Sequence, residues 1–169
     1  MNTNSYRPRR SMLYVPGCNL RYLEKAKSLR ADTLILDLGD PILLDAKIQS
    51  RENVVEMLKQ NIYGKREIVV RVNDFDSPWG LDDVIAVAPL KPDDILFPNI
   101  ESKEDILNCI QHLDASGGKD ISVMFMIESP LAVLNAKEIA SASDRIICMV
   151  LATSDLISQM YARTTQDRI

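Results

Sequence analysis

The sequence predicts an α/β fold of parallel strands, either a (β/α) barrel of the TIM type or an open sheet, with about six β/α units present in its 169 residues. Six short apolar runs recur roughly 22 to 34 residues apart, which is about the length of one strand plus one helix. The runs are continuously apolar rather than alternating, which is typical of parallel strands covered on both faces. Nearly every run also leads into polar or charged residues, and in a barrel of parallel strands these ends meet at one catalytic face.

The apolar runs predict six strands in chain order. They cover residues 12–15, 34–36, 68–70, 95–97, 123–127 and 146–150. The intervening segments predict helices, and four of them start with residues typical of a helix N-terminus, at Asn19, Asp45, Ser77-Pro78 and Ser102 with Asp105. Glycine and proline at 64, 89–92 and 116–118 end helices before the next strand. This order fits a closed barrel or an open parallel sheet, and periodicity alone leaves both open.

Residues 11–169 are predicted to form a single domain, a (β/α) barrel lacking its C-terminal part if the sheet closes, and residues 1–10 form a polar N-terminal segment. Hydrophobic residues make up 46% of the chain and aromatic residues only 5%, so one aliphatic core is expected. An eight-stranded barrel needs about 250 residues. We therefore expect the C-terminal part of the barrel, strands seven and eight, to lie outside this sequence.

Charge and cysteine content exclude several classes of partner. The net charge is −4 and the charges are scattered, which argues against nucleic acid. The three cysteines fit neither a zinc spacing nor a disulfide framework, so reduced thiols and a cytoplasmic location are expected. No apolar run has the length of an export signal or a membrane span, so no membrane partner is expected.

Several motifs carry a resemblance to a known family, in order from about residue 11 to 160. They are Leu13-Tyr14-Val15-Pro16-Gly17, Leu36-Asp37-Leu38-Gly39-Asp40, Val70-Arg71-Val72-Asn73, Ser77-Pro78-Trp79-Gly80, Ile127-Glu128-Ser129 and Asp155-Leu156. In these motifs and their order, the sequence resembles the citrate lyase β-subunit branch of the HpcH/HpaI aldolase family. The resemblance implies a TIM barrel, Mg²⁺, and carbon–carbon cleavage of a citryl, malyl or citramalyl thioester.

The resemblance also implies partners. These are a thioester of coenzyme A or of an acyl carrier, or an oxaloacetate-like acid, as the small-molecule ligand. A homo-oligomer, either a trimer or a hexamer, is expected, and citrate lyase-like subunits are further candidate partners.

Glu128 and Asp155 match the metal ligands of the family. They follow two consecutive predicted strands and offer the hard oxygen ligands that Mg²⁺ accepts, and Glu128 is also a candidate substrate-binding residue. The alternative is that each carboxylate caps the helix after its strand.

Arg71 lies in an apolar strand, and a buried arginine without an anionic partner is very costly. The resemblance assigns it a catalytic and substrate-binding role, in which its planar fork pairs with a substrate carboxylate. The alternative is an internal bridge to Asp37 or Glu128. Asp37 and Asp40 are the other candidate catalytic residues.

Gly17 and Arg21 are candidates for binding coenzyme A phosphates at a helix N-terminus.

Other positions depart from the family. Gly39 stands where glutamate is usual, Asn99 stands where lysine is common, and Thr153-Ser154 stand before Asp155 where Gly-Ala-Glu or Gly-Thr-Asn is more usual. These departures favour a second hypothesis, a catalytically weakened barrel that binds an acyl thioester or acts as an assembly subunit.

Overall fold

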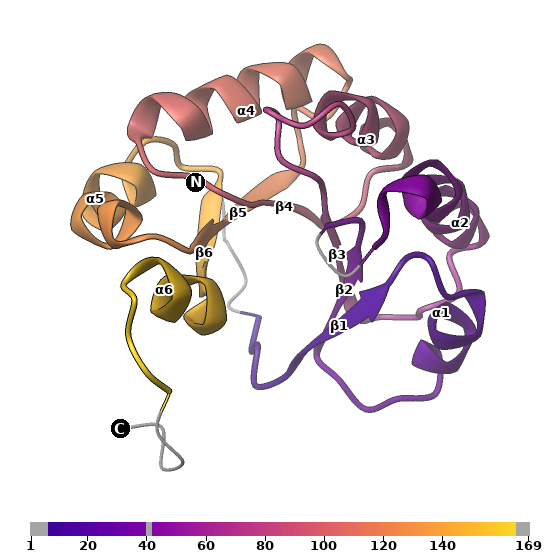
Figure 1. The fold of residues 1–169 in the computed structure, drawn as a ribbon. Helices are drawn as coiled ribbons and strands as arrows, with labels where there is room; N and C mark the ends of the chain where they lie inside the picture. Colours follow the sequence, from indigo (N-terminus) through magenta and orange to yellow (C-terminus); the bar gives the residue numbers. More distant parts are fainter. Residues whose placement is uncertain (1–6, 40–41, 165–169) are drawn as a thin grey trace.

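The computed structural model describes residues 7–39 and 42–164, and it contains one six-stranded parallel sheet in the order β1-β2-β3-β4-β5-β6. The strands are β1 (Met12–Pro16), β2 (Thr33–Asp37), β3 (Glu67–Arg71), β4 (Asp94–Phe97), β5 (Ser122–Ile127) and β6 (Ile146–Leu151). The sheet curves into part of a barrel, with the helices around its outside (Figure 1). The six predicted strands are therefore confirmed, each within one residue at either end, while closure into eight strands stays a prediction.

The helices alternate with the strands as predicted. They are α1 (Leu20–Ala26), α2 (Lys47–Gln60), α3 (Gly80–Val87), α4 (Lys103–Ala115), α5 (Pro130–Ala140) and α6 (Thr153–Gln159), with short 3-10 helices at Leu44–Ala46 and Ala88–Leu90. Asn19 caps α1, and Ser102 with Asp105 forms the predicted capping box of α4.

Two predicted helix starts are wrong. Asp45 does not cap α2, because it lies within the 3-10 helix and Ala46 takes the cap position. Ser77 does not cap α3 either, since its hydroxyl accepts a hydrogen bond from the Trp79 amide in a turn and the helix starts only at Gly80. In both cases the connection after the strand is longer than the sequence pattern suggests.

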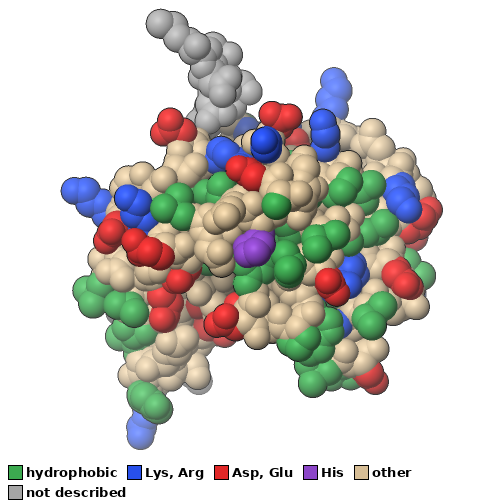
Figure 2. All heavy atoms as spheres, turned by 90° about the horizontal axis from the view of Figure 1, so that it is seen from above, with side chains coloured by type: hydrophobic (Ala, Val, Ile, Leu, Met, Phe, Trp, Pro, Cys, Tyr) green, Lys and Arg blue, Asp and Glu red, His purple; other side chains and the backbone are tan. Residues whose placement is uncertain are grey.

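Two layers of apolar side chains hold the sheet in place. The larger lies between the sheet and its helices, and the smaller lines the inside of the barrel with Ile35, Val69, Leu96, Met124 and Met126. Within the described residues, no helix combines the length and the apolarity needed to cross a membrane. The surface in Figure 2 carries acidic and basic side chains interspersed with hydrophobic ones.

The amino ends of the strands are fastened by arginines of the N-terminal segment. Arg9 donates two hydrogen bonds to Glu67, of 2.8 and 2.6 Å, and Thr33 donates a third of 2.6 Å. Arg10 forms a similar fork on Asp32 and lowers the pKa of that carboxyl to about 2. Residues 7–10 are thus attached to the barrel end opposite the predicted active site.

A second buried carboxyl lies beside Glu67. Asp94, the first residue of β4, is only 2% exposed. Burial, and then the nearby charge of Glu67, raise the pKa of Asp94 to about 7. Burial also opposes ionisation of Glu67, but the Arg9 and Thr33 hydrogen bonds outweigh it and lower the pKa of Glu67.

This pair predicts a pH-dependent stability. Between its ordinary pKa of 3.8 and about 7, folded Asp94 keeps a proton that the unfolded chain has lost, so stability falls as pH rises through this interval. Asp94→Asn removes the buried charge, and we expect it to raise the free energy of unfolding at pH 8 by about 1 to 4 kcal/mol. Urea unfolding at pH 5 and pH 8 measures this.

The matched control is Asp93→Asn, at the neighbouring, 40% exposed carboxylate. Asparagine still offers an acceptor to the Ile68 amide, and the ion pair of Asp93 with Arg7 is exposed, so the free energy of unfolding should change by less than about 1 kcal/mol at both pH values. Parallel pH profiles for the wild type and Asp94→Asn would contradict the assignment.

Candidate active site

Three of the predicted site residues meet at the carboxyl ends of the strands. Asp37 and Arg71 are the last residues of β2 and β3 and are partners in their register, and Glu128 directly follows β5. Arg71 Nη1 lies 3.5 Å from Asp37 Oδ2, and Nη2 lies 3.8 Å from Glu128 Oε1. All three residues are buried. The internal bridges considered from the sequence are thus both present.

Gly39 lies against this cluster. Its amide donates to Asp37 Oδ1 at 2.8 Å, and a Cβ built on it would lie 3.0 Å from Arg71 Cζ. Its φ is not in the left-handed region, so the backbone would accept another residue, but a side chain would press on the guanidinium. A side chain at position 39 would therefore require the Arg71 side chain to shift by a few tenths of an ångström. The adjacent candidate Asp40 lies outside the described residues.

Glu128 does not cap the following helix. The N-cap of α5 is Ser129, whose hydroxyl accepts from the Ala132 amide. Glu128 Oε2 instead accepts a 2.6 Å hydrogen bond from the backbone amide of Asn99. The capping alternative for Glu128 is therefore wrong.

Asp155 lies in the first turn of α6 and is exposed. Ala152 takes the N-cap position without a side-chain hydrogen bond, so Asp155 is not the cap. The register pairs Ile127 with Leu151, and the Ala152 amide donates to Ile127 at 3.0 Å. Glu128 and Asp155 therefore follow neighbouring strand ends at the same edge of the sheet.

The chemistry of these two side chains fits Mg²⁺. Among residues 7–39 and 42–164, no group of three or more His, Cys, Asp and Glu side chains is placed to hold a metal. A closed structural metal site needs four protein ligands, whereas Mg²⁺ is usually held by one or two carboxylates together with waters and substrate oxygens. Binding of Mg²⁺ by Glu128 and Asp155 stays a prediction.

A buried lysine, to which the sequence analysis gives no role, holds the loop after β2. Lys47 is 6% exposed, and its amine donates to the carbonyls of Leu38 and Gly39 at 2.9 and 2.7 Å and to Asn73 Oδ1 at 2.5 Å. Three protein acceptors match the three donors of an ammonium group. Lys47 therefore fixes the loop that follows Asp37.

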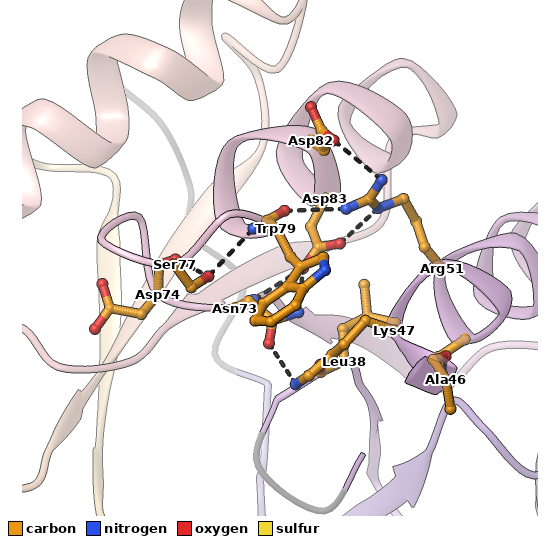
Figure 3. Close-up of polar contacts among 11 residues, drawn as sticks. Leu38, Ala46, Lys47, Arg51, Asn73, Asp74, Ser77, Trp79, Asp82 and Asp83 are labelled. Atoms are coloured by element: carbon orange, nitrogen blue, oxygen red, sulfur yellow. Dashed lines mark hydrogen bonds and ion pairs between the residues drawn. The ribbon is translucent and has the colours of Figure 1, made fainter. Parts of the chain in front are cut away.

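The same network continues to α3 (Figure 3). Asn73 donates through its backbone and its side chain to Asp83 Oδ2, at 3.0 and 2.6 Å, and Arg51 donates to Asp83 Oδ1 at 2.7 Å. Asp83 is 1% exposed. Helical spacing could have indicated Lys47, because it shares one face of α2 with the buried Ser50, Val54 and Met57.

A pocket of about 270 Å³ opens beside the cluster. Arg71, Lys47, Asn99 and Trp79 are among the residues that line it. The Lys47 amine also lies 5.7 Å from the centre of the Trp79 ring. The volume of this pocket suits a small carboxylic acid, and Arg71 is a cation in its lining.

Gly17 and Arg21 lie at the start of α1. The Gly17 amide donates to the Asp37 carbonyl at 2.8 Å, and its carbonyl accepts from Asn53 at 3.0 Å, so Gly17 joins β1 to β2 and α2. Arg21 is exposed on α1. Their contact with coenzyme A phosphates stays a prediction.

Residues 10–168 match the model of the HpcH/HpaI aldolase/citrate lyase family. The chain belongs to this family. A (3S)-malyl-CoA thioesterase from Cereibacter sphaeroides is 41% identical over 162 residues, which cover 96% of this chain and 55% of that protein. The citrate lyase subunit beta of Escherichia coli K12 is 34% identical over 160 residues, covering 91% and 53%. The chain spans about half the length of these curated relatives.

Two solved structures share the fold of this chain. The citrate lyase beta subunit of M. tuberculosis, complexed with oxaloacetate and magnesium, superposes with a TM-score of 0.74 at 23% identity, covering 93% of this chain and 65% of that one. The protein CitE of Mycobacterium tuberculosis with magnesium, acetoacetate and coenzyme A gives 0.72 at 22% identity, covering 94% and 54%. Both of these structural neighbours were crystallised with magnesium, and the second also with coenzyme A.

Proposed function

We propose that this chain forms the acid-binding part of a Mg²⁺-dependent carbon–carbon lyase that acts on a small 3-hydroxyacyl thioester, with a malyl-type thioester as the first candidate. One observation carries the proposal. Arg71 is buried between Asp37 and Glu128 and lines a pocket at the carboxyl ends of the strands. Glu128 adds a carboxylate beside Arg71, and such a carboxylate is the kind of hard oxygen ligand that Mg²⁺ accepts.

In this proposal Arg71 pairs with the carboxylate of the hydroxy-acid end, in the two-pronged geometry that a guanidinium permits. Asp37 holds the guanidinium in place from β2. Glu128 and Asp155 would hold Mg²⁺, which when bound would polarise the hydroxyl and carboxylate oxygens of the substrate. Lys47 has its three donors on protein acceptors, so carboxylate recognition falls to Arg71.

The reaction breaks the bond between the hydroxyl-bearing carbon and the carbon next to the thioester carbonyl. A base takes the hydroxyl proton, the electron pair of the broken bond moves into the thioester as an enolate, and the enolate then takes a proton at carbon. The products are a 2-oxo acid, glyoxylate in the case of a malyl thioester, and a shortened acyl thioester. Asp37 and Asp40 are the proposed groups for the hydroxyl proton.

Thioester hydrolysis is a second candidate, because a (3S)-malyl-CoA thioesterase matches 96% of the chain at 41% identity. Here water attacks the thioester carbonyl and the carbon–sulfur bond breaks, releasing the free thiol and malate. Both reactions use the same recognition of the acid end and differ in which bond breaks.

The experiment incubates the native protein and Mg²⁺ with malyl-CoA, and measures glyoxylate with phenylhydrazine and free coenzyme A with a thiol reagent. Carbon–carbon cleavage gives glyoxylate and acetyl-CoA without free thiol, and this is the result we expect. Free thiol without glyoxylate would mean that the protein hydrolyses the thioester and does not cleave the carbon–carbon bond.

Parallel reactions with citryl thioesters, on coenzyme A and on an acyl carrier protein, test the acyl group and the carrier. Binding without either product on any of these substrates would support the catalytically weakened barrel, to which the departure at Gly39 points.

A further inference from the structure

Asn99 has an unusual backbone conformation beside the site. It follows Pro98 in the connection between β4 and α4, and its φ is 53°, in the left-handed region. Side chains with a Cβ rarely adopt this region, and asparagine is among those that tolerate it best. Its exposed side chain contributes nothing to the apolar core.

Two short hydrogen bonds depend on this conformation. The backbone amide of Asn99 donates to Glu128 Oε2 at 2.6 Å, and its side-chain Nδ2 donates to Asp74 Oδ2 at 2.6 Å. Asn99 therefore joins the carboxylate after β5 to the loop after β3.

Asp74 is a firm anchor for this contact. Its carbonyl accepts from the Ser77 amide at 3.0 Å and from the Ser77 hydroxyl at 2.5 Å, and the two residues lie side by side in Figure 3. The backbone of Gly80 packs so closely on it that a Cβ there would lie 2.3 Å from the Asp74 carbonyl oxygen. Asn73, just before it, is held by Asp83.

We propose that Asn99 is a positioning residue for Glu128. With Arg71 at Oε1 and the Asn99 amide at Oε2, the carboxylate is held from two sides before any metal arrives. The hydrogen bond to Asp74 keeps the Asn99 backbone in the left-handed conformation that aims its N–H at Glu128. This inference rests on the proposed function of Glu128 as a metal ligand.

The test measures Mg²⁺ affinity by titration calorimetry and thermal unfolding of the metal-free native protein. Asn99→Ala keeps the amide but disfavours the left-handed conformation and loses the contact with Asp74. We expect it to weaken Mg²⁺ binding about tenfold, the scale of residues that orient metal ligands. Asn99→Gly tolerates the conformation and loses only the contact with Asp74, so we expect a loss of about threefold.

Asp74→Ala removes the same contact from the other side. Asp74→Ala also loses the 2.9 Å hydrogen bond that Asp74 Oδ1 accepts from the Asp76 amide, within the same loop. Its Mg²⁺ affinity should match that of Asn99→Gly, and the double variant Asn99→Gly/Asp74→Ala should bind Mg²⁺ no more weakly than either single variant, because the contact between Asn99 and Asp74 is lost in all three.

The matched control is Asn61→Ala. Asn61 has a φ of 47° at the C-cap of α2, before the amino end of β3 and away from the site. Asn61→Ala should lose about as much thermal stability as Asn99→Ala, while its Mg²⁺ affinity stays unchanged. This comparison separates the positioning of Glu128 from the general cost of backbone strain.

Two outcomes overturn the inference in different ways. If Glu128→Gln weakens Mg²⁺ binding while Asn99→Ala, Asn99→Gly and Asp74→Ala bind as the wild type does, Asn99 is not a positioning residue and the proposed function stands. If Glu128→Gln also binds Mg²⁺ normally, both the metal site and the role of Asn99 are wrong. Should Asn99→Ala fail to fold, Asn99→Gly and Asp74→Ala decide the question.

Discussion

Glu128→Gln should abolish Mg²⁺ binding at the concentrations that saturate the wild type, with an affinity loss of at least about 100-fold. The change keeps the size of the side chain and its ability to accept the Asn99 amide, but removes the negative charge that would hold the ion. Because polarisation by a metal ion contributes several kcal/mol to a transition state, lyase activity should fall on the order of a thousandfold. Calorimetry and the glyoxylate assay measure the two effects.

Glu67→Gln is the matched control for this change. Glu67 is also a buried carboxylate beside an arginine, but it starts β3 at the opposite end of the sheet. It should lower thermal stability through the weakened contact with Arg9 and leave Mg²⁺ affinity unchanged. Equal loss of Mg²⁺ binding in both variants would mean a general loss of folding rather than removal of a metal ligand.

Arg71→Lys should lower kcat/KM for the malyl thioester about 100-fold, since a point charge cannot reproduce a two-pronged contact with a carboxylate. Lysine keeps the positive charge between Asp37 and Glu128, so the charge balance of the cluster is preserved. The expected signature is weaker binding of oxaloacetate, measured by calorimetry, with a folded protein.

Arg66→Lys provides the comparison. Arg66 donates to four backbone carbonyls, those of Ala26, Lys27, Leu29 and Tyr63, at the amino side of β3. This substitution loses the same planar geometry away from the site, so it should cost stability and leave oxaloacetate affinity intact. If Arg71→Lys binds oxaloacetate as tightly as the wild type does, Arg71 has only a structural role, as a bridge between two strand ends.

Local patterns in the sequence determined the strands and some of the helix ends. A continuous apolar run is a property of neighbouring residues, and so is a capping box such as Ser102 with Asp105, whose bonds span three residues. The meeting of Asp37, Arg71 and Glu128 was also predictable, because parallel strands place their carboxyl ends at one edge.

The tertiary structure decided which groups contact each other around that edge. Asn99 and Glu128 are 29 residues apart, and Arg9 and Glu67 are 58 apart. Nothing in the sequence around Lys47 shows which groups its amine contacts. Its partners come from the loop after β2 and from Asn73, just after β3. Such contacts depend on strand register, loop path and side-chain reach across elements, and no periodicity within one segment encodes them. The sequence therefore indicates where a site forms, while packing between distant segments fixes how each carboxylate in it is held.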